Sequence, residues 1–285
     1  GFVCIGIFAA GIVDYSAGVT AFGAVLVALY IALSMRWLLE KGAAVGRIVQ
    51  GLKSIQAGEL DHTIAPRGGA ELEAVAEGYS ALKIKVGTDF HLDMQRLEEI
   101  RAAVGKHVLL RVDANQGWTP KEAIRTIRFL EDKGLDIELV EQPVKAHDFE
   151  GLKMVTDSVD TLILADESVF SVRDAFTVLS MRAADLINIK LMKTGGIRNA
   201  VAICGMARAC GVECMIGAMM ETKISVSAAC HLASALPVIT RADLDPPILC
   251  ASDPVVGGAT YRGSSVVPSG GAGLGIEKIN GLVLE

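Results

Sequence analysis

After residue 80, hydrophobic and polar positions repeat along the chain with a regular pattern. Short apolar segments end in a polar or small residue every 24 to 28 residues. Between them lie amphipathic stretches of helical length, such as residues 91–105 and 121–134, which end in glycine. We therefore expect alternating strands and helices. The strands should end at Lys85, Asp113, Glu141, Asp166, Lys190, Gly217 and Asp243.

Alternating units of this size predict a parallel sheet, and seven consecutive strands favour a TIM-type (β/α) barrel over a doubly wound sheet. We expect the barrel to occupy residues 81–285. An eighth strand is available in the sequence LDHTIA at residues 60–65. In a barrel, the strand ends converge on the C-terminal face, where this architecture places its chemistry.

Residues 16–35 contain no charged side chain, and a helix of that length is just long enough to cross a hydrocarbon core of about 30 Å. Basic residues follow this segment, beginning with Arg36 and Lys41, and Asp14 precedes it. This bias places the rest of the chain on the cytoplasmic side. We therefore predict a membrane segment within residues 1–35 and a barrel tethered to the inner face of the membrane.

Residues 36–80 show helical periodicity that is interrupted at Gly58 and resumes at Leu72. In AGELDHTI and ELEAVAEGY, this stretch resembles the HAMP linker of membrane sensors. The same residues support a competing interpretation, in which residues 59–80 form the first strand and first helix of the barrel. The sequence does not decide between the two.

Charge and cysteine content narrow the choice of partners. A formal net charge of −6 argues against nucleic acid and leaves small molecules as partners. The six cysteines form no CxxC pair and have no histidine at zinc-like spacing, so we expect reduced thiols and a cytoplasmic location.

The predicted strand ends carry lysines and carboxylates rather than an arbitrary mixture. Asp113, Glu141 and Asp166 end three successive strands, so three carboxylates should surround one point. Such charges require a cation in a dry pocket, and hard oxygen ligands suit Mg²⁺.

Two lysines at the strand ends suit proton transfer. Lys85 and Lys190 lie four strands apart, so we expect them to face each other across the barrel mouth. One base on each face of a substrate carbon permits inversion of a stereocentre. Lys83 points to the same side as Lys85 and, with the metal, would lower the pKa of that base.

The motifs KIKVG, DAN at Asp113, EQP at Glu141, DES at Asp166 and NIKLMKTGG around Lys190 resemble the muconate-lactonizing branch of the enolase superfamily. The resemblance covers residues 81–285. It implies Mg²⁺ held by Asp113, Glu141 and Asp166, and Lys85 and Lys190 as an acid/base pair acting through an enediolate.

Within that branch, GAMMETK at residues 217–223 and ADLDPP resemble the dipeptide epimerases of the L-Ala-D/L-Glu type. In that group, an Asp-x-Asp pair holds the ammonium of the dipeptide, which paired carboxylates suit physically. The resemblance therefore implies an isomerase acting on dipeptides. The substrate-binding residues that it implies are Lys83, Asp243, Asp245, Thr63 and Ala218.

The sequence departs from that family at its N-terminus. Family members carry an α+β capping domain there, and we expect this chain to lack it. Two other functions are considered: an o-succinylbenzoate synthase or cycloisomerase, which needs no ammonium clamp, and a membrane-tethered, non-catalytic fusion. A homo-oligomer is compatible with all three functions.

Overall fold

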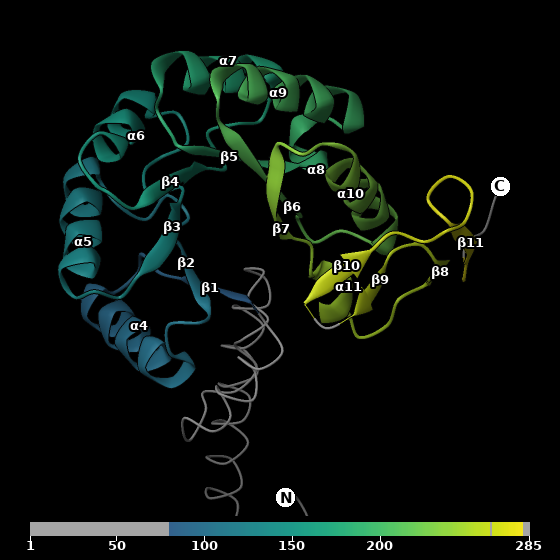
Figure 1. The fold of residues 1–285 in the computed structure, drawn as a ribbon, viewed down its shortest axis with the longest axis horizontal. Helices are drawn as coiled ribbons and strands as arrows, with labels where there is room; N and C mark the ends of the chain where they lie inside the picture. Colours follow the sequence, from purple (N-terminus) through teal and green to yellow (C-terminus); the bar gives the residue numbers. More distant parts are fainter. Residues whose placement is uncertain (1–79, 263, 282–285) are drawn as a thin grey trace, which may run out of the picture. The chain divides into compact units, whose positions relative to one another are not determined.

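The structure, a computed structural model, describes residues 80–262 and 264–281 (Figure 1). Strands and helices alternate through most of this range, as the hydrophobic pattern predicts. In chain order, the elements are β1 (Ala81–Lys85), α4 (Phe90–Val104), β2 (Leu109–Asp113), α5 (Pro120–Asp132), β3 (Ile137–Glu141), α6 (Phe149–Thr156), β4 (Leu162–Ala165), α7 (Val172–Met181), β5 (Leu186–Lys190), α8 (Leu191–Thr194), α9 (Ile197–Cys210), β6 (Glu213–Gly217), α10 (Lys223–Ala235) and β7 (Ile239–Asp243).

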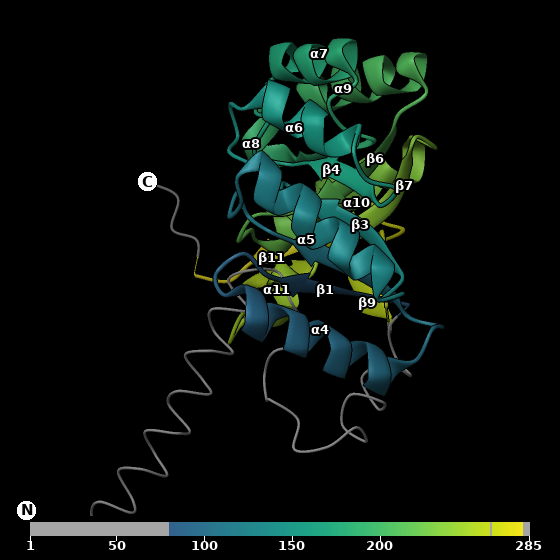
Figure 2. The same cartoon turned by 90° about the vertical axis from the view of Figure 1, so that its left-hand side faces the viewer.

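The seven strands form one parallel sheet in sequence order, from β1 to β7. The strands make an inner arc, and α4, α5, α6, α7, α9 and α10 cover its outer side (Figures 1 and 2). An ion pair between Lys83 on β1 and Asp243 on β7 joins the first and last strands of this sheet. The sheet is therefore curled far enough to bring its two edges within reach of one side chain.

Local sequence signals explain where the helices begin. In α5, Thr119 and Glu122 form a capping box, and Pro120 occupies the first turn, where its missing N–H removes no hydrogen bond. The buried side of this helix carries Ala123, Ile127 and other apolar residues at helical spacing. Side-chain caps also begin α4, α6 and α7, whereas α9 and α10 begin without one.

The core has two parts. The larger lies between the sheet and the helices and includes Leu97, Leu110, Ile127 and Ile203. The smaller lies on the inner side of the curl, and its members are Leu139, Leu164, Leu186 and Met215. Because side chains alternate across each strand, the two cores use opposite faces of the same strands.

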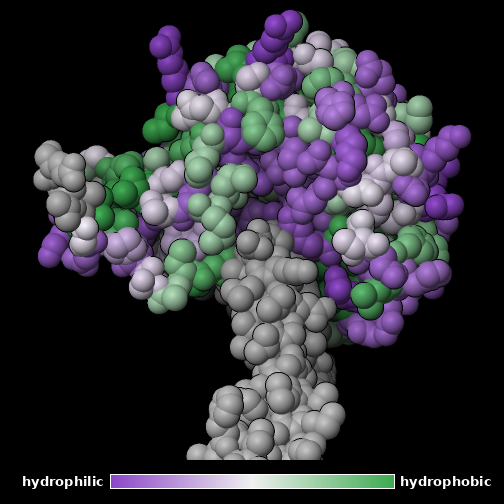
Figure 3. Space-filling model, turned by 180° about the vertical axis from the view of Figure 1, so that it is seen from behind, coloured by the Kyte–Doolittle hydropathy of each residue, from purple (hydrophilic) through white to green (hydrophobic). Residues whose placement is uncertain are grey.

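The inner side of the sheet also contains ion pairs. Glu138 accepts hydrogen bonds from Arg111 at 2.6 Å and from Arg241 at 2.7 Å, and all three side chains are at most 15% exposed. Hydrophilic residues dominate the middle of the face seen from behind, whereas apolar residues lie in scattered patches (Figure 3). The inside of the curl near β1, β2 and β7 is therefore polar.

The chain after β7 continues with α11 (Pro246–Leu249) and short strands in two antiparallel pairs. The first pair joins β10 (Ser265–Val267) to β9 (Thr260–Arg262), and the second joins β11 (Ile276–Ile279) to β8 (Val255–Gly257). Tyr261 donates a hydrogen bond to the carbonyl of Leu244 at 2.6 Å. This contact ties the C-terminal strands to the loop that follows β7.

The predicted strand ends agree closely with the structure. Six of the seven strands end at the predicted residue, and β4 ends at Ala165, one residue before Asp166. No helix in residues 80–262 and 264–281 is long and apolar enough to cross a membrane. The predicted membrane segment at residues 1–35, the HAMP-like stretch up to residue 79 and Thr63 lie outside the described residues.

Candidate active site

The register of the sheet brings the predicted chemical groups to one edge. Lys85 lies beside Asp113, and Asp113 lies beside Glu141, in the pairing of β1, β2 and β3. On the other side of the curl, Lys190 lies beside Gly217, and Gly217 lies beside Asp243. Because all these strands are parallel, their C-terminal ends share one edge, as the sequence predicts.

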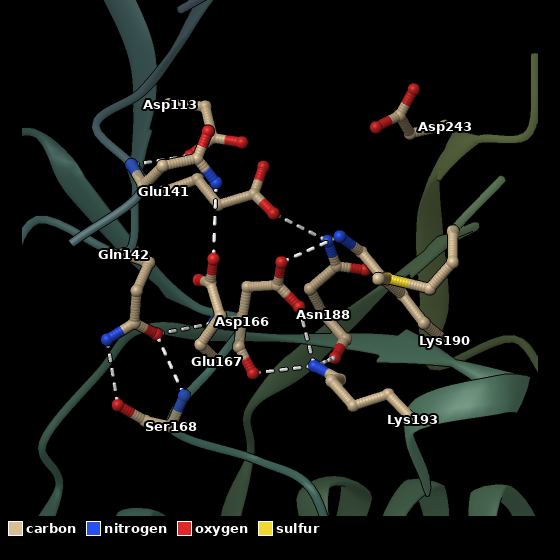
Figure 4. A network of polar contacts seen from close by, with 12 residues as sticks. Asp113, Glu141, Gln142, Asp166, Glu167, Ser168, Asn188, Lys190, Lys193 and Asp243 are labelled. Carbon is tan, nitrogen blue, oxygen red and sulfur yellow. Dashed lines mark hydrogen bonds and ion pairs between the residues drawn. The ribbon is translucent and has the colours of Figure 1, made fainter. Parts of the chain in front are cut away.

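Asp166, directly after β4, is paired with two lysines (Figure 4). Lys190 Nζ lies 2.7 Å from Oδ2, and Lys193 Nζ lies 2.6 Å from Oδ1. Burial alone would raise the pKa of Asp166, but the two ammonium groups outweigh it and hold that pKa well below its usual value. Asp166 is therefore a buried carboxylate with its charge balanced on both oxygens.

Glu141, at the end of β3, is fully buried but less well compensated. Asn188 Nδ2 donates to Oε1 at 2.7 Å, and Lys83 Nζ lies 3.4 Å from Oε2. Burial and the nearby charge of Asp113 raise the pKa of Glu141 to about 8. The charges of Asp113 and Asp166 therefore oppose ionisation of Glu141 more strongly than Lys83 and Lys190 favour it.

Lys83 and Lys85 have different surroundings, although they lie two residues apart on β1. Lys83 is 8% exposed and contacts Asp243, Glu141 and Asp113, the last at 3.8 Å. Burial lowers its pKa, but these carboxylates raise it further, well above the usual value. Lys85 is 23% exposed and lies 2.8 Å from Asp113 Oδ2. Lys85 is thus the more accessible of the two.

Lys190 resembles Lys85 in having a single carboxylate partner at this edge. Its side chain is 11% exposed and, within the described ranges, donates a hydrogen bond only to Asp166 Oδ2. Burial opposes protonation, but Asp166 and Glu141 raise the pKa of Lys190 above its usual value. Protonation of this lysine therefore depends on how the charge of the two carboxylates is balanced.

The two aspartates of the Asp-x-Asp pair at the end of β7 differ in their hydrogen bonding. Asp243 is bound by Lys83, whereas Asp245 is 7% exposed and its buried Oδ2 has no hydrogen-bond partner among the residues that the structure describes. Burial and the charge of Asp243 raise the pKa of Asp245 to about 7. Lys83 and both aspartates also line a cavity of about 500 Å³ between β1 and β7. A cation placed at the Asp245 carboxyl group would therefore stabilise its ionised form.

A buried amide holds the loop that carries Asp166. Gln142, directly after β3, accepts hydrogen bonds from the backbone N–H of Asp166 at 2.9 Å and of Ser168 at 3.0 Å. Its own backbone has a φ of +37°, in the left-handed region that non-glycine residues rarely adopt. Such strain is sustained only where the surroundings hold it in place. The backbone after β3 is therefore shaped to fix Asp166.

Gly217, at the end of β6, makes room for the site. A Cβ at this position would lie 2.7 Å from Asn188 Oδ1 and 3.1 Å from Lys190 Cε. Any side chain here would displace both residues. Ala218, the next residue, packs partly buried against the core. Its predicted role in substrate binding remains a prediction, as does that of Thr63.

Lys193, Asn188 and Gln142 were not among the residues predicted from the sequence. Lys193 lies three residues after Lys190 in NIKLMKTGG, and a single helical turn, α8, brings both ammonium groups to Asp166. Spacing of three residues between two lysines after a strand was the available signal. Asn188 and Gln142 gave none, because their hydrogen-bond partners lie 47 and 24 residues away.

The donor chemistry of this edge fits a divalent cation of the Mg²⁺ type. Asp113, Glu141 and Asp166 are buried carboxylates at neighbouring strand ends, and their oxygens would suit such an ion. Among the residues that the structure describes, no three acidic, histidine or cysteine side chains are gathered closely enough to hold a metal. Lysines instead occupy the spaces between the carboxylates. The raised pKa of Glu141 marks where a further positive charge would be stabilising.

The fold is α/β, with its lysines and carboxylates at the C-terminal edge of a curled parallel sheet. The chain belongs to the family described as enolase C-terminal domain-like, whose model matches residues 69–279. An L-Ala-D/L-Glu epimerase of Clostridium acetobutylicum is 53% identical over 266 residues, which cover 92% of this chain and 73% of that protein. The resemblance to the enolase superfamily is confirmed.

Two solved structures are similar as well. The substrate-liganded L-Ala-D/L-Glu epimerase of Bacillus subtilis is 54% identical, with a TM-score of 0.72, over 74% of this chain. A dipeptide epimerase of Enterococcus faecalis, complexed with Mg and the dipeptide L-Leu-L-Tyr, is 44% identical, with a TM-score of 0.65, over 75% of this chain. The chain spans 59% of the length of each. Relatives at this level of identity are isomerases that act on dipeptides.

Proposed function

We propose that this chain carries the catalytic part of a dipeptide epimerase. The observation that carries the proposal is the pairing of one lysine with one carboxylate on each side of the curl: Lys85 with Asp113, and Lys190 with Asp166. The names of the similar proteins, which are epimerases of L-Ala-D/L-Glu and other dipeptides, support it.

The reaction inverts the carbon next to the dipeptide carboxylate. One lysine removes the α-proton, and the other delivers a proton to the opposite face through an enediolate. Because the enediolate carries two negative charges, bound Mg²⁺ would supply the charge stabilisation that proton removal requires. Asp113, Glu141 and Asp166 would hold that ion. The same positive charge would weaken the hold of these carboxylates on Lys190 and allow it to lose its proton.

We further propose that Asp245 and Asp243 bind the ammonium group of the dipeptide. Two properties of Asp245 support this: its Oδ2 has no hydrogen-bond partner among the described residues, and its pKa is raised. A bound ammonium would donate to that oxygen and lower the pKa. Lys83, which contacts both Asp243 and Glu141, would connect the ammonium end of the site with the metal end. A cycloisomerase substrate without an ammonium would leave Asp245 unsatisfied.

We propose that residues 69–80 belong to the enolase-type domain rather than to a HAMP-like linker. The family model begins at residue 69, inside the stretch assigned to the linker. A match covering 92% of the chain also has to extend far into the first 80 residues. Among the described strands, β1 and β7 each have one neighbour only, which leaves an edge free on both.

The test is hydrogen exchange at the α-carbon in D₂O, followed by NMR for each dipeptide isomer. We expect Lys85→Ala and Lys190→Ala each to abolish epimerisation in both directions, because inversion needs one group to abstract and one to deliver. Each variant should still exchange the α-proton of one isomer, and the two variants should exchange different isomers.

The matched control is Lys153→Ala, which removes an exposed lysine from its pair with Asp157 on α6. This variant should epimerise at the parent rate. If both active-site variants exchange the same isomer equally fast, or if Lys190→Ala epimerises like the parent, the two-base mechanism is wrong.

A further inference from the structure

The exposed sides of α5 and α9 differ in composition, although both helices lie on the outer side of the curl (Figures 1 and 2). Every exposed residue of α5 is charged, as is typical of a helix that faces water. In α9, the exposed residues are mostly apolar or small, and only Arg198 and Arg208 carry a charge. The outer face of α9 is therefore poorly suited to contact with water.

Small residues occupy the centre of this face. Ala202, Gly205 and Ala209 are exposed and lie on the side of α9 opposite the buried Ile203 and Ala207. A Cβ added at Gly205 would meet no atom within 4 Å, so packing inside the described part of the chain does not require a glycine here. Glycine is unfavourable in the interior of a helix. At this position, it leaves space for another backbone to approach α9 closely.

Large apolar side chains adjoin the small residues. Ile197 and Val201 on α9 are 48% and 45% exposed, and Phe176 on the neighbouring helix α7 is 63% exposed. These three residues and the three small ones form the α9 patch. Half-exposed side chains of this size show about 100 Å² each, so the whole patch is on the order of 400 Å².

The size of the α9 patch can be compared with what a stable dimer needs. A standard interface covers about 800 Å² on each partner, and roughly 65% of this area is apolar in homodimers. The apolar requirement is therefore on the order of 500 Å² on each copy. The α9 patch supplies most of that area.

The charges of α9 favour a second copy of the same helix in antiparallel orientation. Arg198 lies in the first turn, which has neither an acidic residue nor a side-chain cap, so the positive end of the helix dipole repels it. In an antiparallel pair centred between Ala202 and Gly205, Arg198 lies opposite Ala209, in the last turn of the other helix. The negative end of that helix stabilises a cation. Arg208 lies at the edge of the exposed face, where interfaces are polar.

We propose that the α9 patch is a homodimer interface, in which α9 packs antiparallel against α9 of a second copy about a two-fold axis. Such an interface uses the same patch twice, so one contact covers the apolar face of both copies. Ala202 and Gly205 lie opposite each other in this arrangement and let the two helices approach closely. The inference goes beyond the proposed reaction and does not depend on it, because the candidate active site lies at the C-terminal edge of the sheet.

The first experiment measures the mass of the full chain in solution by analytical ultracentrifugation. We expect the parent chain to sediment as a dimer. Ala202→Glu places two carboxylates close together in the interface and should weaken the dimer at least about 100-fold. The matched control is Ala102→Glu, which changes an exposed alanine on the outer helix α4 and should leave the dimer intact. Far-UV circular dichroism checks that both variants are folded.

The second experiment tests the orientation of the helices. The exposed Cys210 and Cys250 are first replaced by serine, and this chain serves as the baseline. Ala202→Cys in this background should give a covalent dimer with a short bis-maleimide, because position 202 lies close to its own copy in the antiparallel pair. Ala102→Cys in the same background should not. Mass spectrometry identifies the linked residues.

Three results would each overturn the proposal. They are a parent chain that stays monomeric at every concentration tested, a dimer that Ala202→Glu leaves as tight as the parent, and a cross-link from position 202 to a residue of the same chain. The last result would mean that the chain itself covers the α9 patch. If Ala202→Glu does not fold, cross-linking decides, and absence of the covalent dimer with Ala202→Cys rejects the interface.

Discussion

Asp166 and Asp245 lie at the same edge of the sheet and are both buried, but their pKa values are shifted in opposite directions. Asp166 is 2% exposed and Asp245 is 7% exposed. Asp166 has an ammonium on each oxygen, and its pKa lies well below the usual value. Asp245 has a buried oxygen with no hydrogen-bond partner in the described part of the chain, and its pKa is raised to about 7.

This difference separates a carboxylate whose charge the chain's own lysines balance from one with a buried oxygen that no described residue contacts by a hydrogen bond. Desolvation acts on both in the same direction, so the neighbours decide the sign of the pKa shift. The lysines near Asp166 belong to β5 and α8, whereas Asp245 has Asp243 two residues away, and Lys83 is already bound to Asp243. Burial alone therefore does not decide whether the pKa of a buried carboxyl group is raised or lowered.

The largest effect should come from Asp166→Asn, which tests the satisfied side of the comparison. The substitution leaves two lysines without their carboxylate, and an uncompensated buried charge typically costs about 3–5 kcal/mol of stability. It also removes a proposed metal ligand, so we expect epimerisation to fall at least about a thousandfold. Urea unfolding and the D₂O exchange assay measure the two effects. A variant as stable as the parent would show that the lysines do not depend on Asp166.

Asp245→Asn should have a smaller effect on catalysis than Asp166→Asn, and it should not destabilise the folded chain. An amide removes the uncompensated buried charge, so we expect the free energy of unfolding to stay the same or rise. The loss of a charged acceptor for the substrate ammonium should raise KM about 10- to 100-fold, with kcat less affected. Steady-state kinetics with a dipeptide tests this. If KM is unchanged, Asp245 does not bind the ammonium.

The smallest effect should appear in pH profiles, where the raised pKa of Asp245 has a defined sign. The folded chain binds this proton more tightly than the unfolded chain, whose group titrates near 3.8. Asp245 therefore favours the folded state below that pH, and this contribution is lost as pH rises through about 7. Dipeptide affinity should rise over the same range, because the ionised form binds the ammonium.

The Asp245→Asn variant is the control for the pH dependence of both stability and dipeptide affinity. We expect its stability to depend less on pH between about 4 and 7 than that of the parent. Its dipeptide affinity should lose the rise near pH 7. Identical profiles for the two chains would contradict the raised pKa.

The sequence alone determined the strands and the chemistry of their ends. Alternation of apolar and polar residues is a local property, and it located six of the seven strand ends, among them Lys85, Asp113 and Glu141. Since parallel strands share one C-terminal edge, the same pattern also implied that these residues meet. The family resemblance came from the motifs at those positions, and the comparison with known proteins confirmed it.

The tertiary structure decided which group is paired with which. Lys83 meets Asp243 across 160 residues of chain, and Lys193 meets Asp166 across 27, through the curl of the sheet and the turn of α8. The sequence predicted which residues belong to the site. It did not predict that two lysines pair with Asp166, or that Asp245 has an oxygen without a partner among the described residues. Such differences arise because electrostatic energy depends on distances of a few ångströms between distant segments, which only the packed sheet defines.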